Sequence, residues 1–238
     1  MMVRNRRSNQ RMRSNSPEQM HREWLELVDT DGPFLAAPVL KRAWPQGMPL
    51  LKNLENGQQR AAELRQEKAL FEAAWDEWHR VRVGSDDDKA VADATRKYRE
   101  QEKAWVLFIL RRLLDWREDY RLAEDDAAEA AAYDAESPNG AIRVSPSGLL
   151  KLNDTVGAVV LMVDPVVENL TEIPDDGWNA SAIDRMQHML RAKQSACSIG
   201  LVTDGRWWAV VSAPKGKSAA WGRCDSQRWV DTPQVLKA

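Results

Sequence analysis

The acidic residues around one apolar run are the first candidates for chemistry in this sequence. The valine-rich run from Gly157 to Val163 is preceded by Asp154 and followed directly by Asp164, with Glu168 shortly after. Carboxylates that converge at a strand end can hold Mg²⁺, which prefers oxygen ligands. However, Pro165 follows Asp164, and no lysine stands two residues beyond that aspartate. We therefore expect loop carboxylates that hold no ion, with a Mg²⁺ site as the alternative.

A pair of tryptophans forms a second candidate site. Trp207 and Trp208 follow Asp204-Gly205 in the stretch "SIGLVTDGRWWAVVSAP". Asp-Gly between two apolar runs predicts a tight hairpin of type I′, in which both turn residues have positive φ. Neighbours on a strand point to opposite faces, so the two rings cannot form one stacking platform for nucleic acid. We expect one ring in the core beneath a helix and the other on the covered second face.

Other motifs that carry chemistry are weak or missing. The stretch "PKGKS" at 214–218 resembles the end of a phosphate loop but lacks the earlier glycine, because position 211 is valine. Dinucleotide-binding Gly-x-Gly-x-x-Gly and nucleophile-elbow Gly-x-Ser-x-Gly motifs are absent. No metal-ligand spacing links the histidines, which we expect at the surface or half-buried: His21, His79 and His188. We expect the two cysteines, Cys197 and Cys224, to be free thiols. No catalytic, cofactor-binding or metal residue is therefore assigned.

The N-terminal residues 1–20 are polar and rich in arginine, and we expect a disordered basic tail there. Two interpretations stay open, namely a solvated terminus and an arm that contacts DNA phosphates. Clustered arginines bind DNA through the release of counterions. The candidate nucleic-acid-binding residues are Arg4, Arg6, Arg7, Arg11 and Arg13.

The elements that would position these residues divide the chain into an N-terminal helical part and a C-terminal sheet. Residues 21–57 form an apolar segment whose prolines forbid a long helix, so we expect it to dock against something. Residues 58–134 predict a helical hairpin, with helices over 58–82 and from about 88 to 123. Their apolar faces hold Leu64, Phe71, Trp75 and Trp78 in the first helix, and Trp105, Phe108, Ile109, Leu113 and Trp116 in the second. The acidic, alanine-rich stretch "AEDDAAEAAAYDAESPNG" at the end of the second helix predicts a fraying helix end and then a linker.

Residues 140–238 predict a small α/β domain. The valine-rich run is typical of a buried central strand, and residues 181–194 predict a helix with a capping box from Ser181 to Asp184. The two runs around Asp204-Gly205 and the stretch "WGRCDSQRWV" add strands. The expected fold class is α+β, namely a helical hairpin followed by a small mixed sheet with one helix packed on a face.

Composition excludes several classes of protein. The 238 residues include 34 Lys and Arg against 36 Asp and Glu, so no global positive charge indicates nucleic acid. The longest apolar runs are far too short to span a membrane, and the basic N-terminus is not followed by the apolar stretch of a secretory signal. We therefore expect a cytoplasmic protein that does not contact a membrane.

Three stretches, in this order, resemble the N-terminal region of large bacterial type II restriction-modification enzymes. In that family, which acts in phage defence, a nuclease-like domain is fused to an adenine-specific DNA methyltransferase. The stretches are "EWLELVDTDGPFLAAPVLKRAWPQGMP", "AWVLFILRRLLDW" and "DRMQHMLRAKQSACSIGLVTDGRWWAVV". Within the third, "LVTDGRWW" is similar to the family's hairpin L-x-T-[ND]-G-x-x-[WFY]. The resemblance covers about residues 21–230.

The departures from that family shape what the resemblance implies. Neither the Asn-Pro-Pro-Tyr motif nor the glycine-rich S-adenosylmethionine motif of the methyltransferase occurs, so the chain is similar to a truncated or split N-terminal half. The family's Glu/Asp-x-Lys pattern is missing on the strand that ends in Asp164. The resemblance implies a degenerate restriction-endonuclease-like fold whose cutting site is absent or degenerate. It also implies that this chain holds no cofactor. The chain would contact DNA or a separately encoded methyltransferase-bearing half.

Two alternatives stay open beside this hypothesis. One is an active Mg²⁺-dependent endonuclease that uses Asp154 and Asp164. The other is a helical interaction module without a role on DNA, which would dock through the apolar 33–51 segment.

Overall fold

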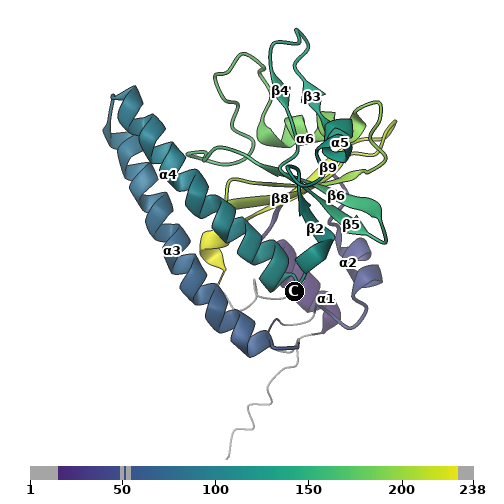
Figure 1. The fold of residues 1–238 in the computed structure, drawn as a ribbon. Coiled ribbons are helices and arrows are strands. Elements are labelled where there is room, and N and C mark those ends of the chain that lie inside the picture. The colour runs from purple at the N-terminus through teal and green to yellow at the C-terminus, as the bar shows by residue number, and fades with distance from the viewer. Residues whose placement is uncertain (1–15, 49–50, 52–54, 230–238) are drawn as a thin grey trace, which may run out of the picture.

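The protein has an α+β fold built around a seven-stranded mixed sheet, in the order β1-β9-β8-β7-β6-β5-β2. The computed structural model describes residues 16–48, 51 and 55–229 (Figure 1). Neighbouring strands are antiparallel except for β6 and β7. The strands are β1 (Asp29–Asp31), β2 (Tyr120–Leu122), β5 (Gly148–Leu152), β6 (Thr155–Met162), β7 (Ile199–Thr203), β8 (Trp207–Ser212) and β9 (Ala220–Asp225).

The parallel pair β6 and β7 is joined by helix α6 (Ala182–Arg191), which confirms the predicted buried strand and crossover helix. Ser181 caps α6 and forms the predicted capping box with Asp184. The face of α6 toward the sheet is fully buried and includes Met186 and Met189. Gly200 on β7 permits this close approach, because a Cβ there would lie 2.2 Å from the Met186 sulfur.

Helices α3 (Gly57–Gly84) and α4 (Asp88–Leu107) form the predicted hairpin (Figure 1). The prediction that the second helix continues to residue 123 is wrong. After α4 a π-helical turn (Phe108–Leu113) leads to Asp115, which has φ of 62°. Arg60 of α3 donates to the Leu113 carbonyl and to the Asp115 carboxylate at 3.2 and 3.0 Å, so a contact from the other helix holds this end. A 3₁₀ turn (Arg117–Asp119) then leads into edge strand β2.

Two hydrophobic cores lie on the two faces of the sheet. The α6 side contains Val159, Val202 and Val211, and the hairpin side contains Val160, Leu201 and Trp208. The hairpin side also receives the predicted apolar faces of α3 and α4, including Leu64, Phe71, Trp75, Trp78 and Trp105. The sheet is therefore larger than expected and is covered on both faces. The core on the hairpin side is therefore formed jointly by the predicted helical hairpin and the sheet.

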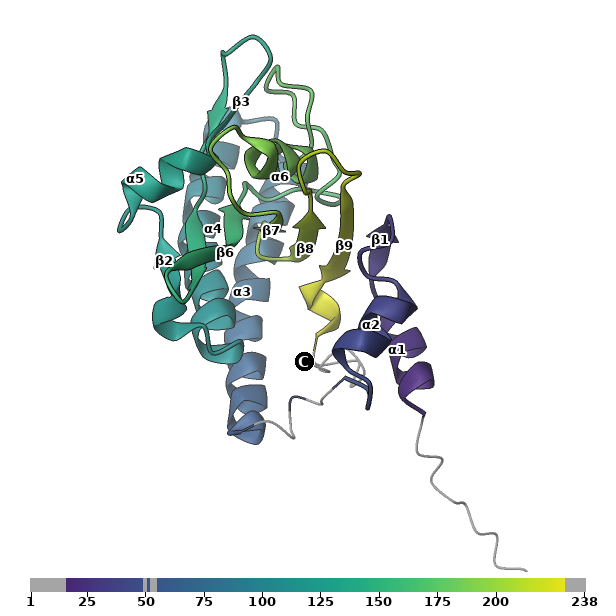
Figure 2. The ribbon, with the colours of Figure 1, turned by 90° about the vertical axis from the view of Figure 1, so that its right-hand side faces the viewer.

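The N-terminal segment forms two short helices and an edge strand. Helix α1 (Pro17–Leu25) begins after the N-cap Ser16, so the predicted tail over 1–20 is wrong for its last residues. Strand β1 pairs with β9, and helix α2 (Ala37–Ala43) is short, as its prolines require. The described residues 21–48 thus dock, as expected, and they do so at the β9 edge. Figure 2 shows α1 and α2 lying together beside this edge.

The stretch after β2 is not the predicted fraying helix and linker. It forms α5 (Ala127–Ala130), a 3₁₀ turn (Ala131–Tyr133) and a small hairpin of β3 (Ala135–Glu136) and β4 (Arg143–Val144). Ala130, Tyr133 and Ala135 are buried in the core beside α6. The small alanine side chains of this stretch allow the close packing. In the sequence, the same alanine-rich and acidic composition is typical of a solvent-exposed helix end, which is why the prediction was wrong. Within the described residues, no helix is long and apolar enough to cross a membrane.

Candidate functional site

The carboxyl ends of the parallel strands β6 and β7 bring together the segment that contains Asp164 and the loop that begins at Asp204. Asp164 follows β6, and Asp204 follows β7. The backbone N–H of Val163 donates to the Thr203 carbonyl at 2.9 Å, so both strands end at the same edge. In sheets with parallel strands this edge is a common place for ligands. The ends of β6 and β7 therefore form the candidate functional site of this fold.

The loop between β7 and β8 is built around the buried Asp204. Its carboxylate accepts backbone N–H groups from Val166, Arg206 and Trp207 at 3.2, 3.1 and 2.6 Å. The predicted hairpin is confirmed, but a type I′ turn is wrong. Gly205 has φ of 86°, whereas Asp204 is not among the non-glycine residues with positive φ. The last strand pair joins Thr203 to Trp208, so the loop is wider than two residues.

Helix α4 clamps this loop from the hairpin side. The Tyr98 hydroxyl donates to the Asp204 carbonyl at 2.5 Å, and the Trp105 indole N–H donates to the Gly205 carbonyl at 2.8 Å. The Trp208 indole donates to the same Gly205 carbonyl at 2.9 Å. A Cβ at Gly205 would lie 2.6 Å from the Phe71 ring, so the helices leave no room for a side chain there. The loop is a fixed part of the core and not a free surface hairpin.

Two buried carboxyl groups lie where α4 meets this loop. Asp204 is fully buried, and burial raises its pKa to about 6, while the N–H groups of Trp207 and Val166 act in the opposite direction. Glu102 on α4 is 4% exposed, and burial raises its pKa well above the ordinary value of 4.5. The charges of Asp204 and Asp164 raise it further. Sequence reasoning missed both groups as site residues.

Asp164, the strongest acidic candidate from the sequence, is held in an ion pair. Its carboxylate accepts from Arg99 Nε and Nη2 at 2.5 and 2.7 Å, and both side chains are more than half exposed. The hypothesis that Asp154 joins it at one metal site is wrong. Asp154 is exposed in the β5–β6 turn, and the eight residues of β6 separate the two by roughly 25 Å at about 3.3 Å per residue. Glu168 is exposed in the loop after Asp164.

These carboxylates do not form a recognisable metal centre. Among residues 16–48, 51 and 55–229, no group of three or more histidine, cysteine, aspartate or glutamate side chains is placed to hold a metal ion. Arg99 occupies both oxygens of Asp164, and backbone N–H groups fill both oxygens of Asp204. The arrangement fixes the loop through hydrogen bonds, but it does not present an open ligand set.

The two tryptophans point to opposite faces, as predicted. Trp207 packs against the core on the α6 side, and Trp208 is buried on the hairpin side. Trp207 also belongs to a row of alternating rings and guanidinium groups. Arg206 lies over Trp75 and Trp207 at 4.4 and 5.2 Å, and Arg223 lies over Trp207 and Trp221 at 5.3 and 5.6 Å. The rings next to these guanidiniums are therefore engaged in packing.

The remaining candidates from the sequence are scattered. His21 is buried, contrary to expectation, whereas His79 is half-buried on Trp75 and His188 is exposed. Lys215 of the "PKGKS" stretch is exposed and donates to the carbonyls of Lys193 and Ser195. Both cysteines are free, as expected. The predicted DNA-contacting residues Arg4, Arg6, Arg7, Arg11 and Arg13 lie outside the described residues.

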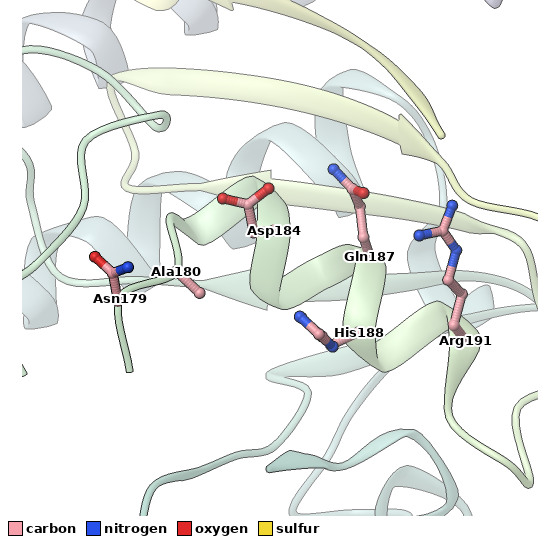
Figure 3. Close-up of a pocket in the computed structure, with 6 residues that line it drawn as sticks. All are labelled: Asn179, Ala180, Asp184, Gln187, His188 and Arg191. Carbon is pink, nitrogen blue, oxygen red and sulfur yellow. The ribbon is translucent and has the colours of Figure 1, made fainter. Parts of the chain in front are cut away.

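A polar pocket of about 280 Å³ lies beside α6 (Figure 3). Its side chains come from α6 and from the two residues that precede the cap, namely Asn179, Ala180, Asp184, Gln187, His188 and Arg191. Asp184 is part of the capping box, and Arg191 donates to the Lys217 carbonyl at 3.0 Å. His188 is exposed on α6, and its ring is tilted against the Trp178 ring, with 5.8 Å between the centroids. Within the described residues, His188 forms no ion pair with a carboxylate, so the pocket shows no acid–base pair that involves this histidine.

Comparisons with known proteins add no relative: no family model matches the chain, and no curated protein or solved structure matches it significantly.

Proposed function

We propose that this chain is a non-catalytic part of a restriction-modification enzyme, with a degenerate nuclease-like fold, that contacts DNA. The whole enzyme would carry its methyltransferase in another part, which is the second partner in this proposal. A function on DNA would place the chain in the cytoplasm. The family resemblance of the three sequence stretches motivates this proposal, and the geometry at the ends of β6 and β7 supports its non-catalytic character.

The single observation that carries the proposal is that the Asp164 carboxylate is paired with Arg99. Hydrolysis by a Mg²⁺-dependent nuclease requires carboxylates free to bind the ion. Here Asp164 forms a two-point ion pair with Arg99, and position 166, where the family's pattern has lysine, is Val166. The backbone of Val166 instead donates to buried Asp204. Side chains at this edge thus stabilise the loop that carries the family-like motif.

The contact with DNA rests on the separation of charge along the chain. Residues 1–15 hold five arginines and no acidic residue, whereas the whole chain has a net charge of −2. This short segment is therefore a local excess of positive charge on a chain that is acidic elsewhere. Such a segment attracts duplex DNA even when the folded part has a negative charge.

The test is the salt dependence of DNA binding. We expect fluorescence anisotropy to show binding of duplex DNA that weakens steeply as salt increases. Replacing Arg4, Arg6 and Arg7 by alanine removes up to three phosphate contacts and should reduce the slope of log K against log salt by about 3. A matched control replaces three exposed arginines of the folded part, Arg42, Arg65 and Arg82. An equal loss in both triple variants would contradict the assignment of the tail.

One observation favours a protein-interaction module as the second candidate function. Val39 and Trp44 on and after α2 are 45% and 37% exposed, within the apolar 33–51 segment. A protein that binds no duplex DNA at low salt would favour this candidate.

A further inference from the structure

Glu102 is a buried carboxyl group without a hydrogen-bonding partner for one of its oxygens. It lies on the apolar face of α4, between Tyr98 one turn before and Trp105 one turn after. Its side chain is 4% exposed, and Oε1 has no partner in the structure. Leaving a polar atom buried without a partner costs free energy, so native proteins contain few such groups, and each calls for an explanation.

The charges around Glu102 come from three elements. Asp204 and Asp164 lie at the ends of β7 and β6, and both act against a negative charge on Glu102. Arg99 on the same helix favours that charge, but it is already paired with Asp164. Arg206 in the 204–206 loop acts on Asp204 and Tyr98.

Helix α3 offers no compensating cation to Glu102. It packs against this part of α4 with the rings of Phe71 and Trp75. Its buried lysine, Lys68, forms an ion pair with Glu72 at 2.8 Å. Glu102 is thus buried on the helix face that enters the aromatic core, and the charges of two carboxylates act against its ionisation.

We infer that Glu102 is a neutral carboxylic acid in the folded protein, and that its ionisation loosens α4 from the 204–206 loop. The contact between the helical hairpin and the sheet is then sensitive to pH. The loop and α4 are joined only by the hydrogen bonds of Tyr98 and Trp105 described above and by packing, so a charge beside them acts on this contact directly. This inference does not depend on the proposed function on DNA.

The sign of the pH dependence follows from the raised pKa. Glu102 is protonated in the folded chain and ionises near its ordinary value of 4.5 in the unfolded chain. Its stabilising contribution is therefore complete below about pH 4.5 and is lost as pH rises toward the folded value. Asp204 acts in the same direction, but only between its ordinary 3.8 and about 6. Above pH 6.5, Asp204 therefore contributes little to the pH dependence of stability, and the remaining dependence tests Glu102.

The experiment compares the full-length protein with Glu102→Gln, which keeps the shape of the neutral acid. Urea unfolding is measured from pH 5 to 9. We expect the wild-type folding constant to fall by up to about tenfold per pH unit above pH 6.5, and the variant to lack this part of the fall. Glu100→Gln, at an exposed position on the same helix, is the matched control and should follow the wild type. Equal pH dependence in wild type and Glu102→Gln would overturn the inference.

Two further measurements locate the effect. At pH 8, hydrogen exchange in peptides covering 98–105 and 201–208 should be faster in wild type than in Glu102→Gln, with no difference at pH 5. A difference elsewhere in the chain, or none, would overturn the loosening of α4. If the variant does not fold, infrared spectroscopy of the wild type at pH 7 should show the C=O band of a protonated carboxyl, which weakens as the pH rises to 9, and its absence at pH 7 would overturn the neutral acid.

Discussion

The hydroxyl of Tyr98 on α4 and the backbone carbonyl of Asp204 after β7 are joined by a 2.5 Å hydrogen bond across 106 positions of sequence. Burial raises the pKa of Tyr98 well above 10, so this hydroxyl stays a donor at any ordinary pH. The bond ties the helical hairpin to the 204–206 loop. Together with the Arg99–Asp164 pair after β6, it places α4 beside the ends of both parallel strands.

Removal of this hydroxyl tests the clamp. Tyr98→Phe should lower the free energy of unfolding by about 1–2 kcal/mol, because a buried carbonyl loses its partner. The matched control is Tyr120→Phe, since the buried Tyr120 hydroxyl has no hydrogen-bonding partner in the structure. Urea unfolding should show little change or a small gain for that control. Equal losses in the two variants would show that the hydroxyl of Tyr98 makes no specific contribution.

Gly205 in the loop between β7 and β8 should tolerate a side chain less well than Gly216 in the loop between β8 and β9. Gly205→Ala places a Cβ 2.6 Å from the Phe71 ring in a backbone conformation with φ of 86°. Gly216→Ala has a similar φ of 73° but meets nothing within 4 Å, so it measures the backbone strain alone. We expect about 1 kcal/mol for Gly216→Ala and a further 1–3 kcal/mol for Gly205→Ala. Thermal unfolding of both proteins gives the comparison, and similar values would contradict the tight fit of Phe71.

The Arg99–Asp164 pair should contribute little to stability. Both side chains are more than half exposed, and such pairs are worth less than about 1 kcal/mol. Asp164→Asn and Arg99→Ala should therefore unfold within about 1 kcal/mol of the wild type in urea. Under the proposed function, Asp164→Asn also leaves the salt-dependent binding of duplex DNA unchanged. A nuclease activity that Asp164→Asn abolishes would contradict the role assigned to Asp164.

Elements with a strong local pattern could be predicted from the sequence. The valine-rich β6 and the capping box of Ser181 and Asp184 depend on neighbouring residues, and both were correct. The end of α4 depends on Arg60, which reaches Asp115 from the other helix of the hairpin, so no local pattern marks it. Strand β1 has the sequence Asp-Thr-Asp, which has low strand propensity and pairs only because β9 offers an edge.

The buried acids of the candidate site were missed for a related reason. A charged residue is usually assigned to the surface. The spacing of Tyr98, Glu102, Trp105 and Val106 nevertheless places Glu102 within the apolar stripe of α4, and this was the available signal. Burial of Asp204 could not be predicted, because it arises from backbone N–H groups that come together only when the loop folds.

The most direct test of the proposed function is one titration of labelled duplex DNA with the full-length protein in the presence of Mg²⁺ or Mn²⁺. Binding is followed by anisotropy at low and high salt, and the same samples are then analysed on a gel. The proposal predicts binding that weakens steeply with salt, while the DNA stays intact at every protein concentration. Cleaved DNA, or no binding at low salt, would contradict it.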